Sequence, residues 1–221
     1  MIVKNTIRML GLATLLAAAT VAASEDVGLV NQINGEVTYA SGGNPAKAKA
    51  YMKVRQVDRF VVPATASVRV VYFQGGRQET FSGPATFVAG TQASQQTTGA
   101  APQVTTLPAG VPQKIAQTPE LIQIAKLGRS GGVAVRGASQ EQRLTAQAQA
   151  EVRQARQTYD QLRKSSAAND IVPEQYLYAV LQDHLLYEEM KGVVAEMQKR
   201  QPSNPDVAVM AEYVKAKTES K

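Results

Sequence analysis

The spacing of apolar residues changes once along this chain, and that change restricts the folds it can adopt. Between positions 27 and 87, apolar residues come in short runs that are rich in β-branched and aromatic types and separated by turn-forming clusters, a pattern typical of β-strands. From Ser139 onward they recur at steps of three and four, which is typical of amphipathic helices. The sequence therefore predicts an α+β chain in which an antiparallel β-sandwich or roll precedes an α-helical hairpin module.

The clearest strand covers residues 68–73, and a pair of glycines follows it. Gly75 and Gly76 accept the positive φ angles that a type I′ turn requires at both of its central positions. A two-residue turn at this place puts Val70 opposite Phe81 as a cross-strand pair on one face of a hairpin. The β-segment as a whole is assigned to residues 25–90.

Two connecting segments follow the β-segment. Gln, Thr, Ala, Ser, Gly and Pro dominate between 90 and 110, where charge vanishes, so residues 91–117 are predicted to be a flexible linker. Residues 118–138 are expected to hold a short helix that starts at Thr118-Pro119-Glu120, and a strand at 131–135.

The last segment, 139–221, is predicted to be helical throughout. Ser139 and Gln142 have the spacing of a capping box, and an apolar stripe runs from Leu144 to Leu162. Pro173 opens a second helix, and a break near Leu185 precedes a third. Asn204-Pro205-Asp206 combines a capping side chain, a first-turn proline and an acid, and therefore marks the start of a fourth.

The first 24 residues are predicted to be a signal peptide. Lys4 and Arg8 form a basic region, residues 9–21 carry no charge, and Val21-Ala22-Ala23 or Ala22-Ala23-Ser24 gives the small-x-small pattern of a cleavage site. The mature chain is then expected in the periplasm of a bacterium, or secreted. An uncleaved anchor is the alternative, but the apolar run is shorter than the roughly 20 residues that span a bilayer. No other segment is long and apolar enough for a transmembrane helix.

Charge and cysteine content narrow the classes of partner and cofactor. The chain has 24 Lys+Arg against 18 Asp+Glu, and without Lys4 and Arg8 the balance is 22 − 18 = +4. Because the basic residues are dispersed, we expect no nucleic-acid partner. The absence of cysteine excludes disulfides and thiolate metal sites, and no cofactor or metal is expected.

The β-segment resembles FecR-like domains. The similarity rests on residues 29–37, on Val57-Asp58-Arg59-Phe60, on residues 68–76 and on Phe81-Ser82-Gly83-Pro84-Ala85. Such domains open with a hydrophobic-x-x-hydrophobic-x-Gly-x-Val strand and continue with a Gly-Asp step, where this chain has Val57 in place of the glycine. The resemblance covers roughly residues 27–90. It implies an exported β-domain with a binding or signalling role and without known catalysis.

The helical segment resembles a tetratricopeptide-type repeat. Leu177, Leu181, Tyr187, Met190 and Val194 fall near the positions that this family uses, and the segment 202–205 is similar to its inter-repeat turn. The resemblance implies one repeat with flanking helices and a role in protein–protein interaction.

No group of residues has the pattern of a catalytic centre, so we expect the protein not to be an enzyme. His184 is the only histidine, and its neighbour Asp183 is predicted to point away from it on a helix. Asp58 has no identified second acid, except Glu36 or Glu79 on strands of unknown register, whereas glycosidases hold two carboxylates across a cleft.

Five residues are candidates for partner contact. In the β-segment, Tyr72 together with Arg69 and Arg77 could frame a sugar or an anionic ligand. In the helices, Tyr178 and Tyr187 could line the concave side of the stack, because aromatic residues are enriched at interfaces. Filling of the cores is the alternative role for these tyrosines.

The expected function is that of a non-catalytic binding or scaffold protein of the bacterial cell envelope, which mediates protein–protein interaction or envelope signalling with an envelope protein as its partner. The alternative is a protein that binds peptidoglycan or another glycan. A third hypothesis, an envelope hydrolase that uses Asp58, would be adopted if turnover were detected and the Asp58→Asn substitution abolished it.

Overall fold

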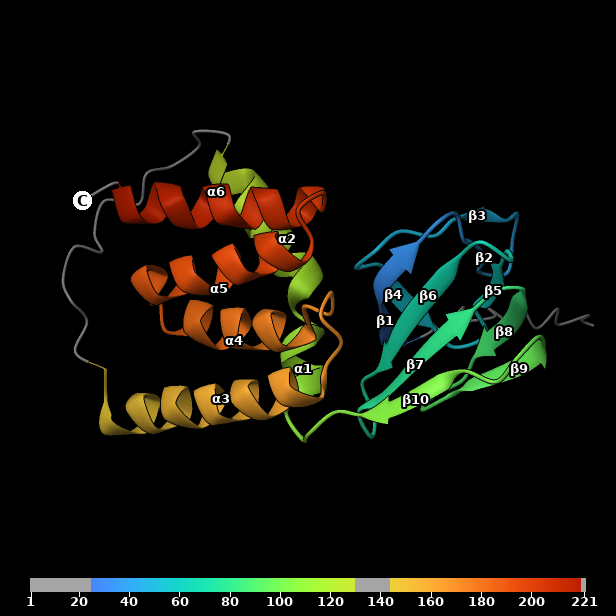
Figure 1. Ribbon diagram of the computed structural model, residues 1–221, viewed down its shortest axis with the longest axis horizontal. Helices are drawn as coiled ribbons and strands as arrows, with labels where there is room; N and C mark the ends of the chain where they lie inside the picture. Colours follow the sequence, from blue (N-terminus) through green and yellow to red (C-terminus); the bar gives the residue numbers. More distant parts are fainter. Residues whose placement is uncertain (1–24, 130–143, 220–221) are drawn as a thin grey trace, which may run out of the picture.

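The computed structural model describes residues 25–129 and 144–219 of the chain. Within these ranges, antiparallel sheets occupy the N-terminal part and helices the C-terminal part, which confirms the predicted α+β class (Figure 1). The predicted signal peptide, the strand at 131–135 and the capping box at 139–142 lie outside the described residues.

The strands form two five-stranded antiparallel sheets. The first sheet has the order β10-β7-β6-β1-β4, and its strands are β1 (Asp26–Asn34), β4 (Lys53–Arg55), β6 (Ser67–Tyr72), β7 (Arg77–Ser82) and β10 (Gln103–Thr106). The second sheet has the order β3-β2-β5-β8-β9, and its strands are β2 (Thr38–Ala40), β3 (Ala46–Lys47), β5 (Arg59–Val62), β8 (Ala85–Ala89) and β9 (Ser94–Thr98).

The two sheets pack face to face around a core that contains no tryptophan. Phe81 of the first sheet stacks on Phe87 of the second with ring centroids 3.9 Å apart, and Phe87 stacks on Phe60 at 4.9 Å. Val68 and Val70 of β6 are buried in the same cluster. Aromatic stacking adds to the stability that apolar burial provides, so three phenylalanines supply the centre of the sandwich.

The hairpin of β6 and β7 differs from the predicted pairing by two residues. Gly75 and Gly76 have φ angles of 74° and 65°, as expected, but Val70 faces Glu79 and Val68 faces Phe81. The loop is longer than predicted because Phe73 leaves the strand and packs against the helical core. The shift is even, so the inward and outward faces of the strands stay as predicted.

The predicted linker 91–117 is instead largely regular structure. β9 pairs with β8 and β10 pairs with β7, so each strand extends one sheet at its edge. The short helix α1 (Val111–Ile115) follows, and its Val111 and Ile115 are fully buried. The low charge and high Gln and Thr content therefore belong to exposed edge strands and not to a flexible tether.

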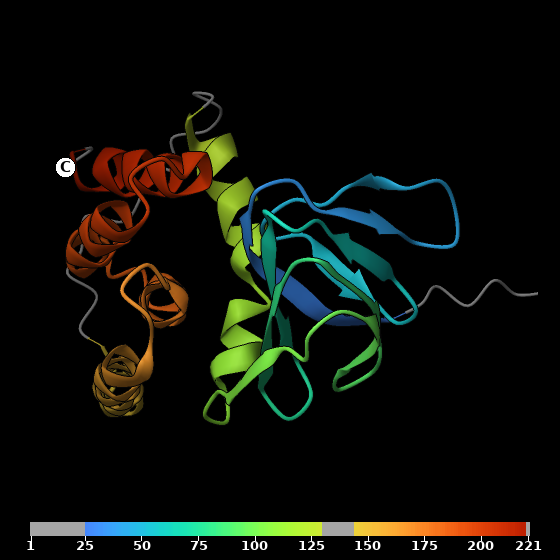
Figure 2. The same ribbon diagram turned by 45° about the vertical axis from the view of Figure 1, so that its right-hand side comes forward.

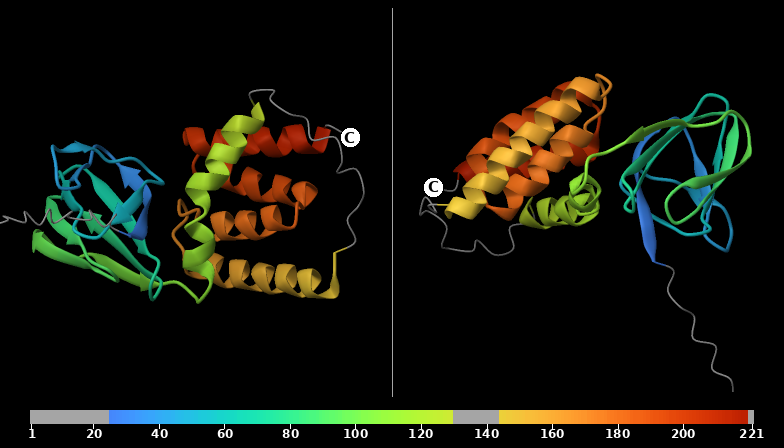
Figure 3. Two further views of the ribbon diagram at one scale, coloured as in Figure 1. Left: turned by 180° about the vertical axis from the view of Figure 1, so that it is seen from behind. Right: turned by 90° about the horizontal axis from the view of Figure 1, so that it is seen from below.

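The helices form a layer with a crossing pair beside it. α3 (Ala146–Ser165), α4 (Val172–Asp183), α5 (Tyr187–Arg200) and α6 (Pro205–Glu219) lie side by side in chain order (Figures 1 and 3). α1 and α2 (Thr118–Arg129) run across this layer, between it and the sandwich (Figure 2). The sequential antiparallel packing follows from the short connections between helices.

The predicted starts of α4 and α6 agree with the structure, whereas α3 begins only at Ala146, after Leu144. The Asn204 side-chain oxygen accepts hydrogen bonds from the backbone N–H groups of Asp206 (3.0 Å) and Val207 (3.3 Å), as predicted. Leu185, where a break was expected, has a φ of 56°. α3 is capped by Thr145, whose hydroxyl accepts from the Ala148 N–H at 3.2 Å.

Candidate functional site

The outer face of the first sheet and the helices share one hydrophobic cluster. Leu29 of β1 and Val71 of β6 are fully buried there, together with Val111 and Ile115 of α1 and with residues of the helical layer. Leu29 and Val71 face each other across the β1–β6 pairing. We call this contact region the junction. It consists of this cluster, the Arg69–Asp170 ion pair and the Tyr51–Asn204 hydrogen bond.

A buried ion pair crosses the junction. Arg69 Nη1 of β6 lies 2.9 Å from Asp170 Oδ2 in the α3–α4 loop, and the two side chains are 13% and 4% exposed. Asp170 Oδ1 also accepts the backbone N–H of Val172 at 2.9 Å, and Arg69 Nε donates to the Thr80 hydroxyl at 3.1 Å. One carboxylate therefore holds both the sandwich and the first turn of α4.

A second charged cluster lies beside this ion pair, centred on Glu174 of α4. The Glu174 side chain is fully buried, and its oxygens accept hydrogen bonds from Arg163 Nη1 (3.0 Å) and Arg200 Nε (3.0 Å). The Tyr159 hydroxyl donates to the same carboxylate at 3.3 Å. Burial and the negative charge of Glu174 both raise the pKa of Tyr159. Two arginines on different helices thus neutralise one buried acid, as burial of a charge requires.

The same arginines fix the loop between α3 and α4 through its carbonyl groups. Arg163 donates to the backbone oxygens of Asp170 (2.6 Å) and Ala167 (2.5 Å). Arg200 donates to the oxygen of Ala168 (3.0 Å), and Gln201 donates to that of Asn169 (2.9 Å). The loop that carries Asp170 is therefore held in place by the helices around it.

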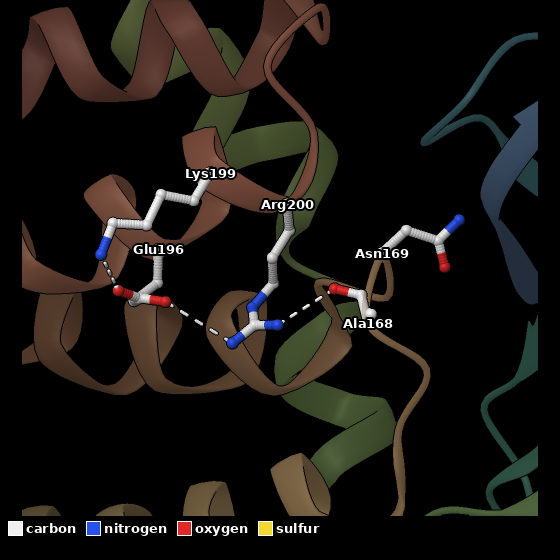
Figure 4. Close-up of a pocket in the computed structure, with 5 residues that line it drawn as sticks. All are labelled: Ala168, Asn169, Glu196, Lys199 and Arg200. Carbon is white, nitrogen blue, oxygen red and sulfur yellow. Dashed lines mark hydrogen bonds and ion pairs between the residues drawn. The ribbon is translucent and has the colours of Figure 1, made fainter.

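A shallow recess of about 330 Å³ opens on the solvent side of this loop (Figure 4). Ala168, Asn169, Glu196, Lys199 and Arg200 line it. Glu196 pairs with Lys199 (2.6 Å) and with Arg200 Nη2 (3.5 Å). The single carboxylate of Glu196 therefore contacts both cations that line the recess.

Two further polar contacts tie the sandwich to the helices. The Tyr51 hydroxyl accepts from Asn204 Nδ2 at 2.9 Å, which links the turn before β4 to the cap of α6. Burial raises the pKa of Tyr51 to about 12, although the Asn204 hydrogen bond partly opposes the rise. Lys53 of β4 pairs with Glu120 of α2 at 2.8 Å on the surface.

The structure corrects the expectation that Tyr72 faces a ligand. Tyr72 is fully buried inside the sandwich, because its strand position points between the sheets. Its hydroxyl bonds to the Ser94 hydroxyl at 2.7 Å, and burial raises the pKa of the phenol. Arg77 lies nearby and pairs with the buried Glu79 at 2.5 Å. Arg69 does not join this group, since it pairs with Asp170 across the junction.

Tyr178 is likewise inside the protein and not on a concave surface. It is fully buried in the helical core, where burial raises its pKa. Tyr187 is half-buried and meets Tyr213 of α6 edge to face, with ring centroids 6.1 Å apart. These tyrosines fill the helical layer, which is the alternative role that the sequence left open.

The residues considered for catalysis lie in separate places. Asp58 Oδ2 accepts the backbone N–H of Arg55 at 2.8 Å and so closes a turn, and Glu36 pairs with Lys47 on the surface at 3.1 Å. His184 Nε2 lies 3.3 Å from Glu151 Oε2.

Lys114 of α1 lies near Glu151, the same residue that His184 contacts. Its amine pairs with Asp183 and lies 3.9 Å from Glu151 Oε1, so α1, α3 and the end of α4 are tied together. Among the described residues, no group of three or more His, Cys, Asp or Glu side chains is placed to hold a metal ion.

Sequence reasoning missed the charged residues at the junction and next to it. Asp170, Glu174, Arg163 and Arg200 were not candidates, because their partners are distant along the chain or lie across a loop of unknown shape. One local signal was present: Asp170 stands shortly before Pro173, at the kind of position from which an acid caps a helix. Nothing local indicated that the same acid would meet Arg69.

A second groove lies between α5 and α6. It has a volume of about 340 Å³ and is lined by residues that include Val194, Ala195 and Ala211 together with Lys191 and Lys215. Within the described parts of the chain, no helix is both long and apolar enough to span a membrane.

Comparison of the chain with protein-family models, with curated proteins and with solved structures found no match.

Proposed function

We propose that this protein is an exported, non-catalytic binding or scaffold protein of the bacterial cell envelope, which brings envelope proteins together. Two sequence features support export and interaction: the signal-peptide pattern of residues 1–24, and the resemblance of the two segments to FecR-like domains and tetratricopeptide-type repeats. The partner we propose is an envelope protein.

The junction is the observation that carries this proposal. A scaffold has to hold two surfaces at a fixed distance, and modules with small polar interfaces move relative to each other by default. Here a shared apolar cluster, the buried Arg69–Asp170 pair and the Tyr51–Asn204 hydrogen bond connect the sandwich to the helical layer. The arrangement suits a body that presents both modules to partners in one orientation.

Photo-crosslinking in living cells tests the proposal. A photoreactive residue replaces Lys215 on α6 or Lys47 on β3, whose side chains are 71% and 63% exposed. We expect discrete adducts with the same envelope protein from at least one position in each module. The matched control is the same variant expressed without residues 1–24, which should give no such adduct. Failure to obtain any discrete adduct from a set of exposed positions on both modules would contradict the proposal.

Export has its own test. The chain purified from the periplasmic fraction should begin after Ala23 or Ser24, as the cleavage pattern predicts. A chain that stays inside the cell with residues 1–24 still attached would contradict the proposed location.

Glycan binding is less well supported than protein binding. That alternative relied on aromatic rings that stack on sugars, and Tyr72, the ring named for this role, is buried between the sheets. Sedimentation with purified peptidoglycan sacculi distinguishes the two functions. Retention that is lost on Arg77→Ser would favour the glycan, whereas a chain that stays in the supernatant agrees with a protein partner.

A further inference from the structure

The edge strands of the sandwich differ in charge. Within the described residues the two sheets end in β3 and β4 on one side and in β9 and β10 on the other. β3 carries Lys47, and β4 carries Lys53 and Arg55. β9 and β10 have the sequences SQQTT and QVTT, and the chain has no charged residue between Glu79 and Lys114. Natural sheets commonly protect edges with charge, above all lysine, and only one side of this sandwich has that protection.

The two uncharged edges lie on the same side of the sandwich. β10 flanks β7 and β9 flanks β8, and β7 and β8 are stacked through Phe81 and Phe87. Both strands run along the lower border of the sandwich in Figure 1. All four residues of β10 and four of the five in β9 are exposed. We call these nine residues the neutral side.

We propose that a second copy of this chain docks on the neutral side, so that β10 pairs with β10 and β9 with β9 around one twofold axis perpendicular to the sheets. Antiparallel pairing of identical edges satisfies this symmetry, and it continues both sheets across the interface. The proposal goes beyond the binding function above, since it names a self-association surface and not an envelope partner.

Charge is the reason for choosing a second copy as the occupant. When two identical strands pair around a twofold axis, the residue on the axis faces the same residue of the other copy, and the residue after it faces the residue before it. A strand that carries one sign of charge would therefore place like charges opposite or close to each other. The central pair in β10 is Val104 with itself or Thr105 with itself. The central pair in β9 includes the uncharged residues Gln95, Gln96 or Thr97. β-branched and Thr–Thr cross-strand pairs are favourable.

The size of the surface sets the expected strength. The nine residues of the neutral side are fewer than the roughly 20–30 residues that each partner contributes to a standard interface. Pro102 and Pro108 flank β10 and cannot donate to a longer ladder. We therefore expect a concentration-dependent equilibrium between monomer and dimer, and not an obligate dimer.

Single cysteines provide a direct test, because the full chain contains none. Facing Cα atoms in an antiparallel pair lie about 4.5–5.5 Å apart, which is within reach of a disulfide. Val104→Cys and Thr105→Cys cover the two registers, and mild oxidation of the exported chain should give a disulfide-linked dimer from one of them. Lys47→Cys in the charged edge β3 is the matched control and should stay monomeric. A dimer from the control alone, or from none of the three, overturns the proposal.

Sedimentation equilibrium of the cysteine-free chain completes the test. The average mass should rise toward twice the monomer mass with concentration, and Gln95→Lys with Gln103→Lys should return it to the monomer value. Ser41→Lys with Asn44→Lys adds the same charge at an exposed turn and should leave the association unchanged. A chain that is monomeric up to about 1 mM, or a dimer that survives the lysines in β9 and β10, overturns the proposal.

Discussion

The junction predicts a large energetic coupling between two residues that lie 101 positions apart in sequence, Arg69 and Asp170. Both side chains are more than four-fifths buried and their charged atoms are 2.9 Å apart. Removal of one partner of a buried pair typically costs about 3–5 kcal/mol, because it leaves the other charge buried and uncompensated. Asp170→Ala also removes the acceptor of the Val172 N–H, which adds about 1 kcal/mol.

A double-mutant cycle isolates the coupling from these other losses. Arg69→Met, Asp170→Ala and the double variant are unfolded in urea with circular dichroism as the readout, and the slopes of unfolding free energy against urea should agree. We expect the double variant to be more stable than the sum of the single losses implies, by about 1–3 kcal/mol.

An exposed ion pair serves as the control for this cycle. Lys199 and Glu196 are 72% and 37% exposed, and their coupling should stay below about 0.5 kcal/mol. If Arg69 and Asp170 coupled no more strongly than this surface pair, the argument that a buried charge pair joins the modules would be wrong.

Three further perturbations follow from the backbone, burial and close packing. Val57 has a φ of 68° and is 69% exposed. Val57→Gly should therefore relieve backbone strain and, after the entropy cost of glycine is subtracted, raise the free energy of unfolding in urea by about 1 kcal/mol. The control Val61→Gly, which lies in a strand, should lower this free energy. Burial raises the pKa of Tyr51 in the folded chain from 10.0 to about 12. Its neutral phenol therefore contributes fully to stability below pH 10, and that contribution is lost as the pH rises toward 12. Tyr51→Phe should reduce the fall of the unfolding free energy between pH 10 and pH 12. Gly128→Ala places a methyl group 2.8 Å from the Tyr213 ring, and thermal unfolding should show a loss of about 1 kcal/mol from overpacking despite the better helix propensity of alanine.

Local patterns were sufficient for the elements whose stability is local. Alternating β-branched residues identified β6, and the capping side chain of Asn204 marked the start of α6, because both signals depend on neighbours within a few positions. The positive φ angles of Gly75 and Gly76 were foreseen for the same reason. The exact hairpin register was not, since it depends on Phe73 packing against distant helices.

Tertiary pairing explains what local patterns could not show. β9 and β10 have little apolar content, and they are strands because the exposed edges of β8 and β7 offer them hydrogen-bond partners. Val57 illustrates the same effect at a single position. The structure gives this valine a left-handed backbone, which its β-branched side chain disfavours.

The candidate site depended almost entirely on long-range contacts. Tyr72 and Tyr178 were selected for their type, yet both are fully buried, because a chain without tryptophan and with few phenylalanines uses tyrosine to fill its cores. Arg69 was expected to pair with an anionic ligand, and it does pair with a negative charge, but that charge belongs to the protein itself. Its true partner, Asp170, could be found only once the α3–α4 loop was placed against β6.

Differential scanning calorimetry of the mature chain tests most directly the claim that the sandwich and the helical layer form one body. If the junction joins them as described, the chain should melt in a single transition whose calorimetric and van't Hoff enthalpies agree. Two separate transitions, with the sandwich and the helices melting independently, would contradict the account.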